Sequence, residues 1–395
     1  MSAHSRLAPS SAFRWVPCPL SVALGEQFPA LHEHPAGPEG TAAHWVWYQM
    51  LRVEAPKLGD MTPEGLPVTD EMLEGALQFV NKVFSIANPH NAMSKVRLEQ
   101  PVSMTGLHAL MFGTPDGSID LLEECGEYHL IDYKFGHRAV SPFENLQLAS
   151  YVFGEFERLE LSGEQIDNAK IFFHIVQPRC FHNRPESMTW ETTGKQLRRL
   201  WTMLNNSAEE AITHELSARS QVGPHCRDCP GRRACPTLRT NADANIDWIN
   251  RSWPAEMPIE AASLELKFVR AALAQMEAHA SGLEEQITYA LENGKLAPDW
   301  VLERGKGRGK SWTVDEREIF ALADLLNSDP EIKPEQRIDL AKPRALITPS
   351  QAESLFKKKG FDSDVIAGYS KPNPGSVSLK AKSDSLAKSV FGAKS

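Results

Sequence analysis

Two neighbouring runs of β-forming residues in the middle of the chain constrain its fold most. Residues 108–123 (HALMFGTPDGSIDLLE) and residues 128–136 (YHLIDYKFG) are both rich in apolar side chains, and the sequence ECGE between them is typical of a turn. The pattern predicts two strands paired as a hairpin. This hairpin is the centre of the predicted fold, because helical and strand-like patterns lie on both sides of it.

Helical and strand-like segments alternate around the hairpin. Residues 71–87 and 143–159 have apolar side chains at helical spacing, and residues 169–179 (AKIFFHIVQPR) are a buried-strand run that ends near a proline. The order helix, strands, helix, strand predicts a compact mixed α/β core of roughly 140 residues. Further helices are expected over residues 194–216 and 259–293.

The length indicates more than one folded unit. The chain has 395 residues, of which 42% are hydrophobic, and domains usually contain about 100–200 residues. We expect a first domain over residues 1–240, a mainly helical accessory domain over residues 241–368 and a disordered basic tail over residues 369–395. The tail is rich in serine and lysine and has few large apolar side chains, so it lacks the surface that a core would bury.

Charge and hydropathy limit the possible partners. The formal net charge is −9, which argues against a broad DNA-binding surface but leaves room for a local basic channel or a metal-bridged phosphate site. Residues 304–310 with Trp312 fit such a channel, and they fit a solvated loop equally well. No apolar run approaches the roughly 18–20 residues of a membrane helix, and residues 1–24 lack the apolar core of a signal peptide. The expected location is the cytosol, without a membrane partner.

Three polar residues of the hairpin point to phosphate chemistry. A hairpin folded about residues 124–126 places Asp116 almost opposite Lys134, with Asp132 one pair away on the same face. Adjacent carboxylates repel unless one is protonated or a cation lies between them, and Mg²⁺ prefers carboxylate oxygens. Such a metal polarises a phosphate and lowers the pKa of its bound water. Lys134 would orient that water or stabilise the developing negative charge.

Three further polar residues indicate a function only when they are considered together. Gln147 and Tyr151 are four residues apart and share one face of the helix expected after the hairpin. His44 lies in an earlier helical stretch, where it could supply a nitrogen ligand. Each piece alone also fits an ordinary role, as a solvated strand face, a packed or surface histidine, or helix surface. The order of the pieces along the chain is what distinguishes these interpretations.

That order matches the pattern of a known nuclease family. The chain contains GTAAH (40–44), GTPD (113–116), IDYK (131–134) and QLASY (147–151) in succession. It resembles the RecB-like branch of the PD-(D/E)XK nuclease superfamily, whose pattern runs Gly-x-x-x-His, Gly-x-x-Asp, Asp-x-Lys, Gln-x-x-x-Tyr. The resemblance implies an α/β fold with a restriction-endonuclease-like core, in which helices flank a mixed central sheet.

The resemblance also implies roles for individual residues. It implies ligands for one or two Mg²⁺ or Mn²⁺ ions, namely His44, Asp116 and Asp132. It implies a catalytic constellation of two aspartates, a lysine, and two residues that support the lysine and the DNA strand, namely Asp116, Asp132, Lys134, Gln147 and Tyr151. Glu99 lies before the hairpin, where some relatives carry an auxiliary carboxylate.

Clustered cysteines indicate a second metal site. Six cysteines are too few for a disulfide scaffold in a chain of this length. The run Cys226-x2-Cys229-x5-Cys235 supplies three thiolates, one short of a tetrahedral site. The residues by themselves leave the fourth ligand open among Cys18, Cys125, Cys180 and His225.

The iron–sulfur members of the RecB-like branch resemble this arrangement. In them one cysteine precedes the nuclease motifs and three follow, and together they hold a [4Fe–4S] cluster that joins the two ends of the domain. The matching residues here are Cys18, Cys226, Cys229 and Cys235. The implied cluster is structural, so its loss should loosen the nuclease domain. Four thiolates also suit Zn²⁺, which stays an alternative.

A closer resemblance, from the opening SSAFRWVPCP to the cysteine run, is to a phage-encoded family of RecB-like proteins. It implies a metal-dependent DNA nuclease, preferably an exonuclease on DNA ends or single strands, that serves phage replication or recombination in the bacterial host cytosol. The implied partners are DNA and a single-strand annealing or other recombination protein. Two rivals stay open: a non-catalytic DNA-binding or recombination module that kept the fold, and a zinc-stapled structure-specific endonuclease.

Overall fold

The computed structural model describes most of the chain. The described residues are 5–32, 36–52, 54–180, 188–249, 256–304, 310–314, 316–328, 333–342, 345–372 and 377–381. They fall into two compact units, Met1–Gln286 and Ile287–Ser395. Each unit has an apolar core of its own.

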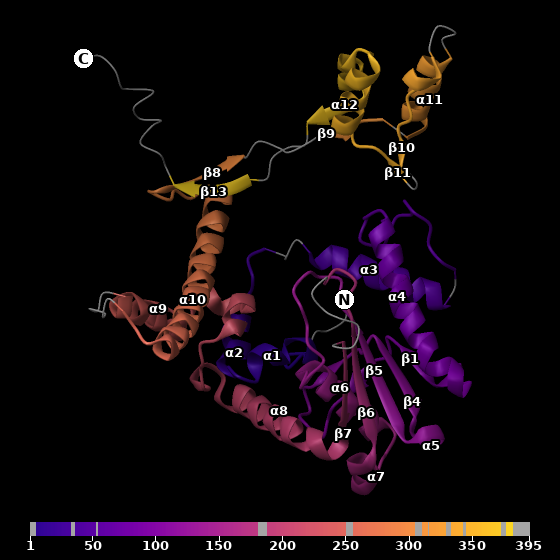
Figure 1. Ribbon diagram of the computed structural model, residues 1–395. Helices are drawn as coiled ribbons and strands as arrows, with labels where there is room; N and C mark the ends of the chain where they lie inside the picture. Colours follow the sequence, from indigo (N-terminus) through magenta and orange to yellow (C-terminus); the bar gives the residue numbers. More distant parts are fainter. Residues whose placement is uncertain are drawn as a thin grey trace, which may run out of the picture. The chain divides into compact units, whose positions relative to one another are not determined.

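A mixed five-stranded sheet forms the centre of the first unit (Figure 1). Its strands are, in spatial order, β1 (Val96–Leu98), β4 (Gly117–Leu121), β5 (Glu127–Tyr133), β6 (Lys170–Val176) and β7 (Thr189–Thr193). β5 and β6 run parallel, and the other neighbouring pairs run antiparallel. A parallel pair needs a crossover, which α6 (Leu146–Arg158) and α7 (Gly163–Asn168) provide. A separate antiparallel pair consists of β2 (Val102–Ser103) and β3 (Phe112–Gly113).

Helices make up most of the rest of the first unit. They are α1 (Ala12–Trp15), α2 (Leu20–Gln27), α3 (Gly37–Arg52), α4 (Asp70–Ala87), α5 (Leu122–Cys125), α8 (Gly194–His214), α9 (Pro236–Ile249) and α10 (Ile259–Glu292), the last of which ends in the second unit. The helices predicted over residues 71–87, 194–216 and 259–293 are confirmed as α4, α8 and α10. No helix in the described part of the chain is long and apolar enough to cross a membrane.

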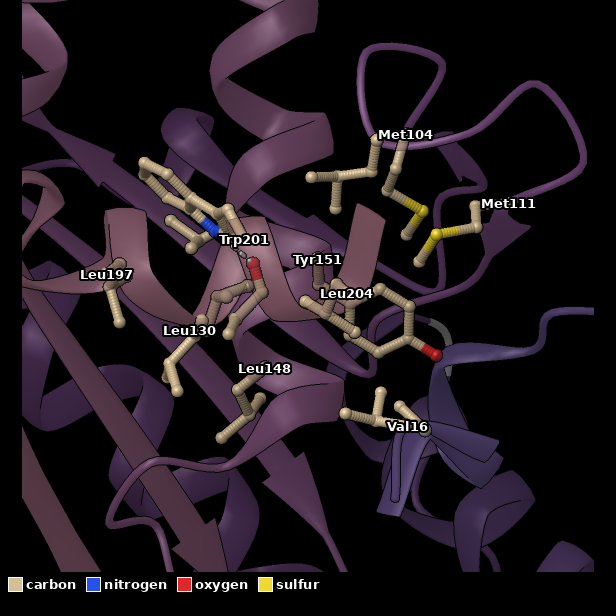
Figure 2. Packing of buried hydrophobic residues seen from close by; sticks show 14 of the residues in the cluster. Val16, Met104, Met111, Leu130, Leu148, Tyr151, Leu197, Trp201 and Leu204 are labelled. Atoms are coloured by element: carbon tan, nitrogen blue, oxygen red, sulfur yellow. Dashed lines mark hydrogen bonds between the residues drawn. The ribbon is translucent and has the colours of Figure 1, made fainter. Parts of the chain in front are cut away.

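Successive residues of β5 point to opposite faces of the sheet and join different apolar clusters. Leu130 packs in one cluster with residues of α6 and α8, which Figure 2 shows around Leu148 and Trp201. Ile131 and Tyr133 pack in the other cluster with residues of α3 and α4. A sheet that is buried on both faces lies between two helical layers. The predicted α/β class, with helices flanking a mixed sheet, is therefore observed.

Asp116 lies directly before β4, and its cross-strand partner differs from the predicted one. The ladder pairs Gly117 with Ile131. One further step along the same register places Asp116 opposite Asp132 rather than opposite Lys134. The two carboxylates are therefore closer neighbours than the sequence pattern indicated.

The turn of the hairpin explains this shift. The prediction centred the turn on Cys125, whereas the connection is a single helical turn, α5, which ends where Gly126 adopts a φ of 75°. Glycine accepts this left-handed conformation without strain. The helical turn moves the centre of the hairpin by one residue, so every cross-strand partner moves by two.

The first unit extends beyond the boundary predicted at residue 240. α9 and most of α10 belong to it. Glu285 on α10 accepts a hydrogen bond from the Leu31 backbone N–H at 2.7 Å and pairs with Arg232 at 2.7 Å. Helical spacing marks α10 as a helix but does not say which core it joins, and for that reason the expected boundary is wrong.

The second unit combines helices with short strands, so it is not mainly helical as predicted. Its elements are β8 (Trp300–Arg304), β9 (Lys310–Trp312), α11 (Glu316–Asn327), β10 (Ala341–Lys342), β11 (Ala345–Leu346), α12 (Pro349–Lys359), β12 (Ser370–Pro372) and β13 (Val377–Ala381). Phe356 and Ile366 are fully buried in its apolar core. Strands of two to five residues carry too few side chains for a clear alternating pattern.

Two of these strands lie in the tail over residues 369–395 that was predicted to be disordered. β12 pairs with β9, and β13 pairs with β8, both antiparallel. The side chains of these residues do not predict a folded core. Their backbone N–H and C=O groups nevertheless pair with those of β8 and β9, because every such group gains from a hydrogen bond. The prediction is wrong for these two strands. Residues 382–395 of the tail, and residues 305–309 of the predicted basic loop, lie outside the described residues.

Candidate functional site

The end of β5 carries the predicted Asp-x-Lys motif. Asp132 lies on the strand and is only 2% exposed. The Lys134 backbone N–H donates to Val176 O at 2.9 Å, which extends the pairing with β6 by one residue. Because alternate residues share a face of a strand, the Lys134 ammonium reaches the Asp132 carboxylate, and Nζ donates to Oδ1 at 2.9 Å.

Gln147 forms a triangle with these two side chains. Its Nε2 donates to Asp132 Oδ1 at 3.1 Å, and its Oε1 accepts from Lys134 Nζ at 3.3 Å. Asn145 caps α6 by accepting hydrogen bonds from the backbone N–H groups of Gln147 and Leu148. The cap fixes the first turn of α6, and this turn presents the Gln147 amide to the end of β5. One amide group thus contacts both the carboxylate and the ammonium.

Tyr151 lies one turn further along α6, next to the same site. Its hydroxyl hydrogen-bonds with the Gln147 side chain and the Thr114 backbone, and burial together with the Asp116 carboxylate raises the pKa of Tyr151. The phenol therefore stays protonated at neutral pH. A Cβ on Gly113 would lie 2.9 Å from Tyr151 Cε1, which explains the glycine that begins GTPD.

Asp116 and His44 form the other half of the site. The Tyr133 backbone N–H donates to Asp116 Oδ2 at 2.6 Å, and the Tyr133 carbonyl oxygen lies 3.1 Å from His44 Nε2. A carbonyl only accepts, so Nε2 is the donor of this contact, and in the neutral tautomer that follows Nδ1 is an acceptor. Nδ1 lies 3.5 Å from Asp116 Oδ1. In that tautomer the two atoms are both acceptors, and a cation between them would bind to both.

Glu99 joins this half of the site through its backbone and its charge. Its backbone N–H donates to Asp116 O at 3.1 Å, and the residue adopts a left-handed φ of 46°. Burial raises the pKa of Glu99; the His44 ring opposes this effect and the Asp116 carboxylate adds to it. Glu99 therefore lies within electrostatic reach of both residues, at the place predicted for an auxiliary carboxylate.

Burial and neighbouring charges together set the pKa values of Asp132 and Lys134. Removal from water raises the pKa of Asp132 to about 6, against the attraction of Lys134 and with the repulsion of Asp116. Burial lowers the pKa of Lys134, but the Asp132 and Asp116 carboxylates outweigh it and hold that pKa above its usual value. Asp132 Oδ2 is buried and has no hydrogen-bond partner within the described residues. A carboxylate oxygen left alone in this way offers a position for a cation.

The donor atoms of the site fit a hard divalent ion. They are oxygens of Asp116 and Asp132 and the Nδ1 of His44, which are ligand types that Mg²⁺ and Mn²⁺ accept. In the described part of the chain, no group of three or more His, Cys, Asp or Glu side chains could hold a metal ion as it stands. Mg²⁺ commonly binds only one or two carboxylates and takes water and substrate phosphates as its other ligands. The site therefore needs such added oxygens to complete a coordination shell.

The predicted cluster ligands line one small cavity elsewhere in the first unit. Its walls contain all four cysteines, namely Cys18, Cys226, Cys229 and Cys235. Neither Cys125 nor Cys180 borders this cavity. His225 does, but its Nε2 lies 2.9 Å from Gln221 O and is engaged there. The structure thus brings Cys18 to the three clustered cysteines, across more than half of the first unit's sequence.

Backbone N–H groups point at each of the four sulfurs. The donors are Gln221 and Ser21 for Cys18, Gly223 for Cys226, Gly231 for Cys229 and Leu238 for Cys235. Such hydrogen bonds favour the thiolate over the thiol. Burial acts in the opposite direction and raises the pKa of Cys226 to about 11. A bound metal would offset that effect, so the sulfurs and their donors fit a metal or an iron–sulfur cluster.

Residues 4–386 match a family model described as "Protein of unknown function (DUF2800)". The chain belongs to the DUF2800 family. The match begins before Cys18 and ends after β13, so it spans both units and both candidate sites. The second unit is thus as much a part of the DUF2800 pattern as the sheet and its helices.

The sequence patterns of this DUF2800 protein did not reveal Arg14. Burial lowers the pKa of Arg14, whereas charges on Cys229 and Cys18 would raise it. Its Nε is buried without a hydrogen-bond partner among the described residues. The guanidinium therefore lies where it could balance negative charge on the cysteines. The only signal in the sequence is its position four residues before Cys18, one helical turn away.

A second missed feature links the two candidate sites. Arg138 Nη1 donates to Asp228 Oδ2 at 2.7 Å. Arg138 lies four residues after Lys134, and Asp228 lies between Cys226 and Cys229. The loop after the Asp-x-Lys strand is therefore tied to the cysteine loop, a contact that no local pattern predicts.

Proposed function

We propose that this DUF2800 protein is a metal-dependent DNA nuclease with a RecB-like PD-(D/E)XK core. The observation that carries the proposal is the triangle that buried Asp132 forms with the half-buried Lys134 and Gln147, with Asp116 opposite Asp132 and with Asp132 Oδ2 left without a partner among the described residues. A solvated strand face would not bury the aspartate, whose exposed fraction is only 2%. Buried charged groups with displaced pKa values are typical of functional sites.

The chain's own residues divide the work of phosphodiester hydrolysis. His44, Asp116 and Asp132 would hold Mg²⁺ or Mn²⁺, which when bound polarises a phosphate and lowers the pKa of a water molecule. Lys134 keeps its positive charge and stabilises the negative charge that develops on the phosphate. Gln147 fixes both Lys134 and Asp132.

The cysteine cavity completes the proposal. Cys18 and the three cysteines of the loop would hold a [4Fe–4S] cluster that ties the N-terminal arm to the end of the nuclease core. The described cysteines line a common cavity but form no group of three that could hold one metal ion as it stands. Four thiolates suit an iron–sulfur cluster or Zn²⁺, and the preference for the cluster rests on the resemblance in motif order.

Two parts of the proposal rest on the resemblance in motif order rather than on the geometry. One is an exonuclease activity on DNA ends in phage replication or recombination. The other is a single-strand annealing or recombination protein as partner in the host cytosol.

The test is degradation of end-labelled linear DNA and of covalently closed circles, both single- and double-stranded, with Mg²⁺ or Mn²⁺. Anaerobically purified protein is compared with Lys134→Ala and with the control Lys170→Ala, which changes an exposed lysine on β6. We expect metal-dependent loss of linear DNA that only Lys134→Ala abolishes. Cutting of circles would instead favour the endonuclease, and no cleavage by any form would favour the non-catalytic module.

A further inference from the structure

Two cavities of the first unit join into one groove that starts at the candidate active site. The first, of about 960 Å³, borders Lys134 and Gln147. The second, of about 970 Å³, borders the cysteine loop and α10. They are adjacent because five residues line both, namely Phe13, Pro17, Arg138, Ala139 and Gln221. The groove therefore leads from the end of β5 to the loop that carries Cys226.

The residues that line the groove include more cations than carboxylates although the protein is acidic. The lining contains four cations against two carboxylates, a net +2, from Lys134, Arg138, Arg219, Arg227, Glu144 and Glu277. Three of the cations also pair with carboxylates outside the lining, which are Asp132, Asp228 and Glu210. The whole chain carries −9. A basic groove in an acidic protein concentrates a polyanion along one path, because the surrounding surface repels it.

Phe13 lies at the junction of the two cavities with an exposed ring. It belongs to α1, where Ala12 and Trp15 are fully buried while Phe13 is 43% exposed. The buried side of α1 anchors the helix and leaves the Phe13 ring in the groove wall. Aromatic rings in basic grooves stack on unpaired bases. The bases of a duplex already stack on one another, so this surface suits a single strand.

Arg138 is held in place at the same junction. Asp228 fixes one N–H of its guanidinium, and Gln177 Nε2 donates to the Arg138 carbonyl at 2.7 Å. A guanidinium has five N–H donors, so fixing one of them orients the others. Arg227 on the cysteine loop is exposed and lines the second cavity. Both arginines are placed to contact phosphates.

We propose that this groove binds a single DNA strand from the scissile phosphate to the cysteine loop. Phe13 stacks on a base at the junction, and Arg138 and Arg227 contact phosphates on either side. The inference rests on the proposed nuclease function and deepens it in two ways: it selects a single strand over a duplex, and it adds a binding subsite along the groove beyond Lys134.

The test measures binding without cleavage. Fluorescence anisotropy with the full chain, in a chelator, compares a labelled thymidine strand of about 15 nucleotides, near the upper site size of single-strand binding folds, with a duplex of equal length. We expect Phe13→Ala to weaken binding of the strand roughly 5- to 100-fold, and Phe13→Trp to restore it. The control is Phe84→Ala, because Phe84 on α4 has a similar exposed fraction of 37% and lies outside both cavities. Unchanged affinity in Phe13→Ala, or equal losses for strand and duplex, would overturn the proposal.

A second variant keeps the test decisive if Phe13→Ala fails to fold. Arg227→Gln changes an exposed side chain and should weaken strand binding and reduce its salt dependence. Arg198→Gln, on a 53% exposed arginine paired with Asp167, should not. Binding of the strand that depends on Phe13 and Arg227, with no cleavage in Mg²⁺ or Mn²⁺, would support the groove and refute the nuclease. If cleavage depends on Lys134 while Phe13→Ala and Arg227→Gln both bind the strand normally, the nuclease function would be supported and the groove refuted.

Discussion

Lys134 Nζ donates to Asp132 Oδ1 at 2.9 Å, while Asp132 Oδ2 is buried without a hydrogen-bond partner among the described residues. The two oxygens of the Asp132 carboxylate therefore differ in their hydrogen bonding. Oδ1 belongs to the network with Lys134 and Gln147. Oδ2 is left for a cation. Burial raises the pKa of Asp132 to about 6, and a cation bound to Oδ2 would oppose this effect and favour the carboxylate.

Gln147→Leu tests whether this network positions the lysine. The substitution removes the amide that contacts both Lys134 and Asp132, so the ammonium loses its orientation but keeps its charge. We expect kcat for DNA hydrolysis to fall roughly 10- to 100-fold, with a smaller change in KM. Gln78→Leu, on the exposed face of α4, serves as the control. Equal kcat values for the two variants would contradict the positioning role.

Cys18→Ser tests the cysteine cavity. Cys18 is the only one of the four cysteines outside the loop, so its loss separates the N-terminal arm from that loop. We expect loss of bound iron and of the visible absorption band. Stability should fall by roughly 2–5 kcal/mol, the range for removing a natural cross-link, measured by urea unfolding. Cys125→Ser changes an exposed thiol on α5 and should alter neither the bound iron with its absorption band nor the free energy of unfolding. Iron retained in Cys18→Ser would rule out this ligand set.

The glycines of two motifs should respond differently to alanine. In Gly113→Ala the new Cβ would lie 2.9 Å from Tyr151 Cε1 and 3.2 Å from Pro9 Cδ. We expect a loss of roughly 1–3 kcal/mol and weakened DNA cleavage, since the Tyr151 ring must move. Gly40→Ala meets no atom within 4 Å inside α3 and should be neutral or stabilising by up to about 1 kcal/mol. Thermal unfolding of both variants is the measurement, and equal effects would refute the steric argument.

Two buried histidines should make the fold sensitive to acid. His129 Nδ1 lies 3.1 Å from His174 Nε2, and burial lowers the pKa of His129 to about 4 and that of His174 well below its usual value. The unfolded chain binds these protons near pH 6.5 and the folded chain does not, so stability falls as the pH drops from 6.5 towards 4. His129 alone should contribute about 2 kcal/mol to the difference between pH 7 and pH 5.

His129→Phe tests this pH dependence. The new ring can stack on Phe172 as the imidazole does, at a centroid distance of 4.7 Å, but it cannot bind a proton. Urea unfolding at pH 7 and pH 5 should show a smaller difference than in the unchanged protein. His90→Phe replaces an exposed histidine and should leave the difference intact. If the difference in stability between pH 7 and pH 5 is unchanged in His129→Phe, other groups cause the acid sensitivity.

The half of the candidate site around Asp132 follows from local periodicity. Strand side chains repeat every two residues, which puts Asp132 and Lys134 on one face, and helix residues four apart lie on the same side of the helix, which puts Gln147 and Tyr151 on one face. The structure adds that the two faces meet. The hydrogen bonds of the Asn145 cap decide this, because they set where α6 begins.

The other half could not be derived from spacing. The partner of Asp116 depends on the shape of the turn, and a helical turn closed by Gly126 shifted the register. His44 reaches Asp116 only because α3 packs against the sheet face that carries Tyr133. Arg138 and Asp228 are 90 residues apart in the chain. Contacts of this kind depend on packing over long sequence separations, about which a local pattern carries no information.

The sequence by itself determined the α/β class, the principal helices, the Asp-x-Lys and Gln-x-x-x-Tyr faces and the run of three cysteines, because periodicity and residue chemistry act over a few neighbouring positions. Tertiary structure alone decided the hairpin register, the end of the first unit at Gln286, the pairing of β12 and β13, and the basic groove past Phe13. These features depend on which apolar faces and which strand edges come into contact in the packed chain. The arrangement that buries the most apolar surface over the whole molecule decides those contacts.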